Sequence, residues 1–132
     1  DHVDFLGPLP NAIACNEIVQ ADAYVQLSGD VVTAVPGGSY LHCEGMGRSI
    51  LEAISAGTPV IAGHSGALPE IVSADRGVLL PLSEPAALLA RQVRGFLSRY
   101  ERSRPTDQYS WNYVFRRYEK LWEDRDAHSC HH

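Results

Sequence analysis

Short apolar segments alternate with amphipathic ones along this sequence. Four runs rich in β-branched or other apolar residues, each closed by a turn-forming residue, are predicted strands: Val3 to Leu6, Ala23 to Leu27, Val60 to Ala62 and Val78 to Leu80. Four segments with apolar residues at helical spacing are predicted helices: Asn11 to Gln20, Gly47 to Ala56, Ser83 to Leu97 and Ser110 to Trp122. The alternation predicts an α/β fold with a Rossmann-like parallel sheet and flanking helices.

Turn and capping residues refine the ends of the predicted helices. Asn11 is a candidate amino-terminal cap for the first helix, and Pro85 suits the start of the long helix after Ser83. Gly57 suits the left-handed conformation that ends many helices, and Pro59 follows it closely. The final helix is expected to pack through its aromatic face, which consists of Trp111, Tyr113, Tyr118 and Trp122.

The segment from Ser28 to Cys43 interrupts this alternation with sixteen residues that lack helical periodicity. Pro36, Gly37, Gly38 and Ser39 predict a turn near its middle. Two structures agree with that pattern, a hairpin-like excursion and a mobile loop.

Composition limits the classes of function. The chain has 132 residues, 45% of them hydrophobic and 20% charged, which fits one soluble globular unit. The formal net charge of -5 argues against a nucleic-acid surface, which is usually basic. No apolar run approaches the roughly 20 residues that cross a bilayer, and the first residues do not resemble a signal peptide. We therefore expect a cytoplasmic protein.

The cysteines and histidines give no sign of a disulfide framework or a metal site. Cys15, Cys43 and Cys130 are an odd number without paired spacing, so reduced thiols are expected, with Cys43 as a small buried one. The histidine-rich end, from His128 to His132, has no second ligand cluster. We expect a domain over residues 1–122 and a disordered tail over residues 123–132.

The candidate chemistry lies between Glu44 and Val60, where a glycine-containing loop leads into a predicted helix. Gly45 and Gly47 remove side chains where a ligand can approach the backbone, and the first helical amides favour an anion. These amides form a candidate phosphate-binding site, and Glu44 and Glu52 lie on either side of it in the sequence. Carboxylates in those positions are suited to bind hydroxyl groups. A nucleotide sugar carries hydroxyl groups on both sides of its diphosphate.

The same residues also have purely structural interpretations. Ser49 and Glu52 fit the Ser-x-x-Glu capping box of a helix start. Arg48 and Glu52 are one turn apart and suited to pair, and Glu44 can simply be solvated. Residue spacing alone does not decide between the two interpretations.

Three segments in this order resemble the signature of glycosyltransferase family 4, the glycosyl transferases group 1. They are Glu-Gly-Met-Gly-Arg-Ser-Ile-Leu-Glu-Ala from Glu44, Ala-Gly-Thr-Pro-Val-Ile-Ala from Ala56, and Gly-Ala-Leu-Pro-Glu-Ile-Val from Gly66. A looser likeness extends from Phe5 to Tyr118 and covers most of the chain. The resemblance implies the GT-B architecture, with this chain as the later part of the carboxy-terminal, donor-binding domain.

The resemblance also implies roles for single residues. Glu44 is the expected catalytic residue at the transferred sugar, and Glu52 the expected ligand of the ribose hydroxyls. The remaining expected donor-binding residues are Gly45, Met46, Gly47, Arg48, Ser49 and Leu51. The backbone from Gly45 to Ser49 is expected to lie against the sugar and diphosphate, with Leu51 beside the nucleoside.

The implied activity is transfer of a hexose from a nucleotide-diphosphate sugar, with retention of configuration, to an acceptor that is a glycan, a lipid or a small molecule. No metal or other cofactor is expected, since a helix terminus and basic side chains stabilise the departing diphosphate. A full-length enzyme of this family is expected in the cytoplasm, where it can act at the inner membrane surface.

Three departures from the family pattern bear on this interpretation. Gly66-Ala67 stands where the family usually has two glycines, and the segment from Ser28 to Cys43 is longer than usual. Nothing before Asp1 supplies the acceptor-binding domain or the family's phosphate-binding Arg and Lys. We expect this chain alone to transfer no sugar at a useful rate.

Two other classes of function stay open at this point. A nucleotide-sugar epimerase or a dehydrogenase has a related sheet, although Gly-x-Gly-x-x-Gly is absent after the first predicted strand. A non-catalytic, self-associating fragment is the third class, and its partner is a second copy of the chain.

Overall fold

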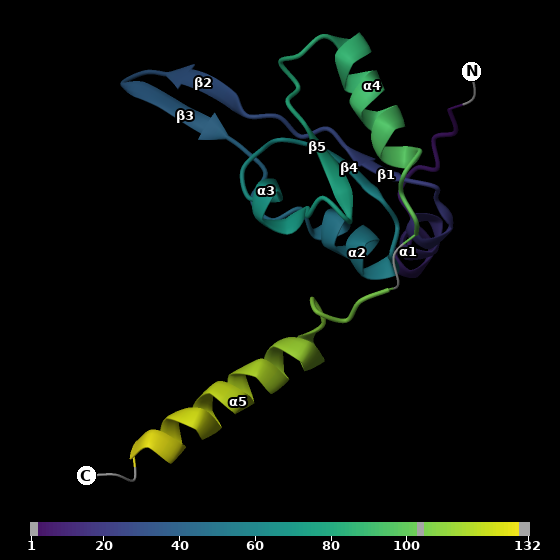
Figure 1. The fold of residues 1–132 in the computed structure, drawn as a ribbon. Coiled ribbons are helices and arrows are strands. Elements are labelled where there is room, and N and C mark those ends of the chain that lie inside the picture. Colours follow the sequence, from purple (N-terminus) through teal and green to yellow (C-terminus); the bar gives the residue numbers. More distant parts are fainter. Residues whose placement is uncertain (1–2, 103–104, 130–132) are drawn as a thin grey trace.

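A parallel three-stranded sheet forms the centre of the fold (Figure 1). The computed structural model describes residues 3–102 and 105–129, and side chains up to residue 120. The strands β1 (Tyr24–Gln26), β4 (Val60–Gly63) and β5 (Gly77–Leu80) lie in the order β1-β4-β5. Tyr24 is paired with Val60, and Val60 with Gly77. The predicted parallel α/β fold is confirmed, and three of the four predicted strands are present.

Within the described residues, five helices surround the sheet or extend from it: α1 (Asn11–Gln20), α2 (Arg48–Ala56), α3 (Leu68–Ile71), α4 (Ala86–Leu97) and α5 (Trp111–Ser129). Helix α2 contacts β1 and β4, whereas α4 contacts β5. Figure 1 shows α1 and α2 on one side of the sheet and α4 on the other. Strands with flanking helices on both sides follow from the short apolar runs separated by helical segments. None of the helices in the described part of the chain is long and apolar enough to cross a membrane.

The core lies between α2 and β4. It consists of buried apolar residues from α2, β4 and the segment that follows: Ile50, Ala53, Ile54, Val60, Ala62, Leu68 and Val72. Residues 50, 53 and 54 lie on one face of α2 because helical neighbours are three and four positions apart. Every residue of β4 is buried, since β4 is the middle strand. The core therefore holds the start of α2 against the central strand.

Helix α2 ends as its sequence predicts. Gly57 adopts the left-handed conformation with φ 76°, and the Thr58 amide donates to the Ala53 carbonyl at 2.9 Å. A hydrogen bond from an amide to the carbonyl five residues earlier is typical of the Schellman motif at a helix end. The left-handed residue in this motif is usually glycine, because glycine has no Cβ to clash with the backbone. The chain can then turn directly into β4 through Pro59.

The segment after β1 forms a hairpin, which decides between the two structures that its sequence allows. Strands β2 (Val31–Val35) and β3 (Gly38–His42) are antiparallel. Pro36 and Gly37 form the turn, with Gly37 at φ 89°. Figure 1 shows the hairpin projecting from the body of the fold, and its second strand leads directly to Glu44.

The predicted strand from Val3 to Leu6 is wrong. These residues are irregular and exposed, and the exposed fraction of Phe5 is 94%. A strand requires a neighbour to accept and donate its backbone hydrogen bonds. No segment in the described part of the chain pairs with these residues, and β1 has β4 as its one neighbour in that sheet.

The first helix has its predicted bounds, but its predicted cap is wrong. Pro10 occupies the position before α1, where no side chain caps the helix. Asn11 is already helical, and its amide oxygen accepts a hydrogen bond from the Cys15 thiol at 2.9 Å. Pro10 has extended backbone angles that suit the residue before a helix, so Asn11 is shifted one position into the first turn.

The last two helices begin after their predicted starts, α4 by three residues and α5 by one. Helix α4 begins after Pro85, and α5 begins at Trp111 but continues to Ser129 rather than ending near Trp122. Figure 1 shows α5 extending away from the sheet. Trp111 and Tyr118 are exposed, so the expected packing of the aromatic face is absent at these two positions. The domain limit at residue 122 stays a prediction, and residues 130–132 lie outside the described part.

Candidate functional site

The loop of residues 43–47 brings Glu44 to the start of α2. Gly47 precedes the helix with φ 62°, a left-handed conformation that favours glycine. The helix begins at Arg48, one residue later than predicted. The first amide groups of a helix lack intrahelical acceptors and carry partial positive charge, so this end is suited to an anion.

The Glu44 carboxylate accepts three hydrogen bonds. The Gly47 amide donates to Oε1 at 3.0 Å, while Gln26 Nε2 and Ser28 Oγ donate to Oε2 at 2.7 and 3.1 Å. The bond from the Gly47 amide is the largest cause that lowers the pKa of Glu44 below its usual value, and Ser28 adds to it. Glu44 is therefore held as an oriented carboxylate rather than left free in solvent.

The backbone of Glu44 is fixed from the opposite side by the turn of residues 65–67. The Glu44 amide donates to Ser65 Oγ at 3.1 Å, and its carbonyl accepts from the Ala67 amide at 3.1 Å. Ser65 is 1% exposed and donates in turn to Asp30 Oδ1 at 2.6 Å. Ser65 and Ala67 therefore hold the loop that carries Glu44.

A cavity of about 380 Å³ opens beside Glu44. Its walls come from α1, β1, the loop and α2, and its lining residues are Asn11, Gln26, Glu44, Gly47, Arg48, Ser49 and Glu52. The structure thus brings both predicted glutamates to one cavity at a helix start. Gly45 and Met46 are exposed and Leu51 is half-buried, and these three are not among the described lining residues. The predicted ligand roles of all eight residues stay predictions.

The structural interpretations of Ser49 and Glu52 are wrong. Gly47 is the capping position, so Ser49 lies inside the helix, and its hydroxyl donates to Gln26 Oε1 at 3.0 Å. No ion pair joins Arg48 and Glu52 among the described residues. The Glu52 side chain is exposed and makes no hydrogen bond within the described part of the chain. No hydrogen bond or ion pair in the described part of the chain therefore assigns Glu52 a role in stabilising the fold.

Four polar residues hold Glu44 directly or through a neighbour and have no role in the sequence prediction: Gln26, Ser28, Asp30 and Ser65. They follow or end β1 and β4, and in parallel sheets the carboxyl ends of the strands are where ligand sites form. Polar residues at two neighbouring strand ends are the signal from which they could have been found.

The cysteine and histidine side chains near the site form no comparable arrangement in the described part of the chain. Cys43 is exposed, so the prediction of a buried thiol is wrong, because Cys43 lies in the loop after β3 rather than in the core. The His42 ring lies beside the Tyr40 ring in the hairpin, with centroids 4.5 Å apart and the ring planes tilted by 59°. His64 lines a separate cavity with Asp30. Among the described residues, no group of three or more acidic, histidine or cysteine side chains could hold a metal ion.

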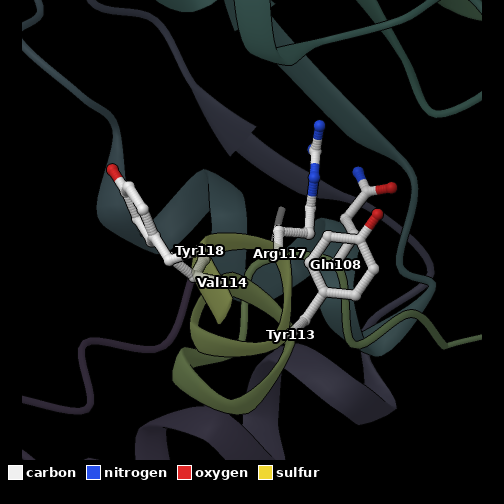
Figure 2. Close-up of a pocket in the computed structure, with 5 residues that line it drawn as sticks. All are labelled: Gln108, Tyr113, Val114, Arg117 and Tyr118. Carbon is white, nitrogen blue, oxygen red and sulfur yellow. The ribbon is translucent and has the colours of Figure 1, made fainter. Parts of the chain in front are cut away.

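A hollow of about 320 Å³ along α5 is another concave feature of the described chain. Its residues come from one helix and the loop before it: Gln108, Tyr113, Val114, Arg117 and Tyr118. Figure 2 shows Gln108 and Arg117 extending together, while Tyr118 points away from them. These side chains do not converge on one point, and none of the described lining residues is a carboxylate, so the cavity beside Glu44 is a stronger candidate than this hollow.

The lowered pKa of Glu44 predicts how its contribution to stability depends on pH. The folded chain binds the Glu44 proton less tightly than the unfolded chain, whose reference pKa is 4.5. The stabilisation is therefore complete above that value and is lost as the pH falls through the lower, folded pKa. We expect Glu44→Gln to be less stable than the wild type at pH 7, with a difference that shrinks below about pH 4.5. Urea unfolding from pH 3 to pH 7 measures this, and parallel curves would contradict it.

Comparison with known proteins agrees with the geometry. Residues 1–111 match the family described as glycosyl transferases group 1. Over 83 residues, the chain is 36% identical to a protein of Corynebacterium glutamicum named GDP-mannose-dependent monoacylated alpha-(1-6)-phosphatidylinositol monomannoside mannosyltransferase. That alignment covers 63% of this chain and 20% of the relative's length. No solved structure matches the chain significantly. With its parallel sheet, its paired glutamates at a helix start and a match over most of its length, the chain belongs to the glycosyl transferases group 1 family.

Proposed function

We propose that this chain binds the nucleotide-sugar donor of a retaining glycosyltransferase in the cavity beside Glu44. The observation that carries the proposal is that Glu44 and Glu52 line one cavity at the start of α2. The diphosphate lies at the helix start, where free amides and the helix dipole favour negative charge. Glu44 faces the transferred sugar, and Glu52 binds the ribose hydroxyls.

The contacts of the two glutamates support different roles for them. Glu44 is held by three protein donors and has limited capacity left, which suits a fixed contact with one hydroxyl of the sugar. Glu52 is exposed and makes no described hydrogen bond, so both of its oxygens are available to adjacent hydroxyls such as those of a ribose. Hydrogen bonds to an ionised acceptor are roughly twice as strong as neutral ones.

Transfer requires stabilisation of the negative charge on the departing diphosphate. The amides at the start of α2 and the Arg48 guanidinium, which lines the same cavity, supply positive charge at that place. Groups fixed before the reaction need no reorganisation as the charge develops. Donor binding is the property to measure on this chain, because the proposed site consists of groups that line the described cavity.

The relative suggests the donor and the class of acceptor. Its name specifies GDP-mannose and a phosphatidylinositol mannoside, and this chain spans 20% of its length. From this name we propose a guanosine diphosphate sugar as the first donor to test on this chain. We propose a lipid-linked acceptor at the inner membrane surface as the class of acceptor. The family match favours sugar transfer over epimerase or dehydrogenase chemistry.

The test is calorimetric titration of the chain with guanosine, uridine and adenosine diphosphates and with GDP-mannose. We expect Glu52→Ala to weaken binding of the preferred nucleotide about tenfold or more, which corresponds to roughly 1.4 kcal/mol. The melting temperature should not change, because the Glu52 side chain makes no described contact that supports the fold.

Glu17→Ala is the matched control, since it removes another exposed glutamate, from α1, that does not line the cavity. It should leave both affinity and stability unchanged. A folded wild-type chain that binds no diphosphate, or equal affinities in the wild type and Glu52→Ala, would overturn the proposed function.

A further inference from the structure

We propose that Gln26 is a positioning residue for donor recognition, which orients the Glu44 carboxylate and connects it to the first turn of α2. This inference rests on the proposed function. Gln26 is the last residue of β1, at the carboxyl edge of the sheet, and is half-buried. Glu44 lies 18 residues further along the chain and Ser49 23 residues further, so this one amide joins three separate elements.

The two ends of the Gln26 amide have different partners. Its Nε2 donates to Glu44 Oε2 at 2.7 Å and to Ser28 Oγ at 3.1 Å. Its Oε1 accepts from Ser49 Oγ at 3.0 Å and from the Tyr24 hydroxyl at 3.4 Å. An amide nitrogen carries two donor hydrogens and an amide oxygen two acceptor sites. All four are used within the protein, so Gln26 acts through Glu44 rather than on the ligand directly.

The orientation of this amide is set by charge. An ionised carboxylate can only accept, so the nitrogen of Gln26 must face Glu44. The opposite orientation would place the amide oxygen against the carboxylate. The Ser49 hydroxyl then holds the oxygen end from α2. As a result, the direction of the Glu44 carboxylate is tied to the helix start where the diphosphate is proposed to lie.

A positioning role has a different signature from a role in folding. Loss of the Gln26 amide should weaken the contacts of the sugar, which Glu44 is proposed to touch, more than those of the nucleoside diphosphate. The decisive quantity is therefore the ratio of affinities for GDP-mannose and for guanosine diphosphate, or for the matching pair of whichever base the wild type prefers. A general loss of stability would lower both affinities together and leave the ratio unchanged.

The experiment compares the wild type with Gln26→Leu and Gln26→Glu by calorimetry at pH 7. We expect the affinity ratio to fall about fivefold to tenfold in Gln26→Leu, with nucleoside diphosphate binding changed less than about twofold. Gln26→Glu keeps the shape of the side chain but places a second carboxylate beside Glu44. At pH 7 we expect it to lose sugar recognition as fully, with partial recovery as the pH is lowered and one carboxyl becomes protonated.

A carbon-13 titration of the Glu44 carboxyl tests the link without any ligand. Gln26→Leu removes a donor, so the pKa of Glu44 should rise toward its usual value. Gln92→Leu is the matched control, since Gln92 Nε2 donates to Glu84 Oε2 at 3.2 Å and neither residue lines the cavity. It should change neither the Glu44 pKa nor the affinity ratio.

The outcomes separate the two proposals. An unchanged affinity ratio and Glu44 pKa in folded Gln26→Leu would overturn the positioning role and leave the proposed function standing. Absence of any diphosphate binding by the wild type would overturn both. If Gln26→Leu does not fold, the pH-dependent behaviour of Gln26→Glu decides, and an affinity ratio in that variant equal to the wild type at every pH would overturn the positioning role.

Discussion

Gly66→Ala is expected to destabilise the chain by about 3 kcal/mol or more, a large part of the stability of a single domain. Gly66 has φ 49°, a conformation that costs side-chain-bearing residues roughly 1–2 kcal/mol. A Cβ at this position would also lie 2.0 Å from the Glu44 carbonyl oxygen. That oxygen accepts the Ala67 amide, so the two segments cannot separate without losing the bond.

Urea unfolding followed by circular dichroism measures this effect, and Gly95→Ala is its matched control. Gly95 lies inside α4, and a Cβ there would meet no neighbouring atom within 4 Å. Because alanine loses less backbone freedom in a helix, we expect Gly95→Ala to stabilise the chain by about 0.5–1 kcal/mol. Equal unfolding midpoints for the two variants would contradict the assigned contact between Gly66 and Glu44.

The regular elements could be predicted where local pattern and burial agree. The spacing of Ile50, Ala53 and Ile54 defines the buried face of α2, and Gly57 ends that helix as predicted. The position of the hairpin could be predicted from the sequence. The sequence did not distinguish a hairpin from a mobile loop, because the turn residues suit both structures. In each of these cases the element is formed by one continuous stretch of the chain, so its pattern can be read along the sequence.

The errors arise where structure depends on distant partners. The apolar run from Val3 to Leu6 has strand composition, but no described segment pairs with it. Cys43 has the character of a buried residue, yet the position of the hairpin leaves it exposed. The aromatic residues of α5 have helical spacing, while the helix extends away from the sheet (Figure 1). Composition alone does not specify which surface will be covered.

In the candidate site, too, local features could be predicted from the sequence, whereas contacts between distant residues could not. Glu44 and Glu52 could be named from a loop, a helix start and the family resemblance, and the structure places both on one cavity. The hydrogen bonds from Gln26 and Ser28 to Glu44 span 18 and 16 residues, and the bond from Glu44 to Ser65 spans 21. Each partner follows or ends a strand, but the pairing of residues so far apart in the sequence has no local signature. The shape of the site is thus set by strand ends that the sheet brings together.

Leu68→Ala is expected to destabilise the chain by about 2–5 kcal/mol, the range for removing a fully buried leucine side chain. Leu68 is 0% exposed and belongs to the core beneath the start of α2. Its Cδ2 lies 2.7 Å from where a Cβ on Gly47 would be. The same leucine therefore supports both the core and the residue whose amide donates to Glu44.

A double-mutant cycle with Gly47→Ala tests this contact. Gly47→Ala alone should cost about 1–2 kcal/mol for its left-handed conformation, with more for the clash with Leu68. In the double variant the clash is absent and the added methyl group enters the space left by Leu68. The combined loss of stability should therefore be smaller than the sum of the two single losses by about 1 kcal/mol, measured by urea unfolding.

The control cycle combines Leu68→Ala with Gly95→Ala. Its two changes in stability should be additive, since the added methyl group in α4 meets no neighbour. Additivity in both cycles would show that Leu68 does not support Gly47, and that the geometry of the Glu44 loop is independent of the core below it.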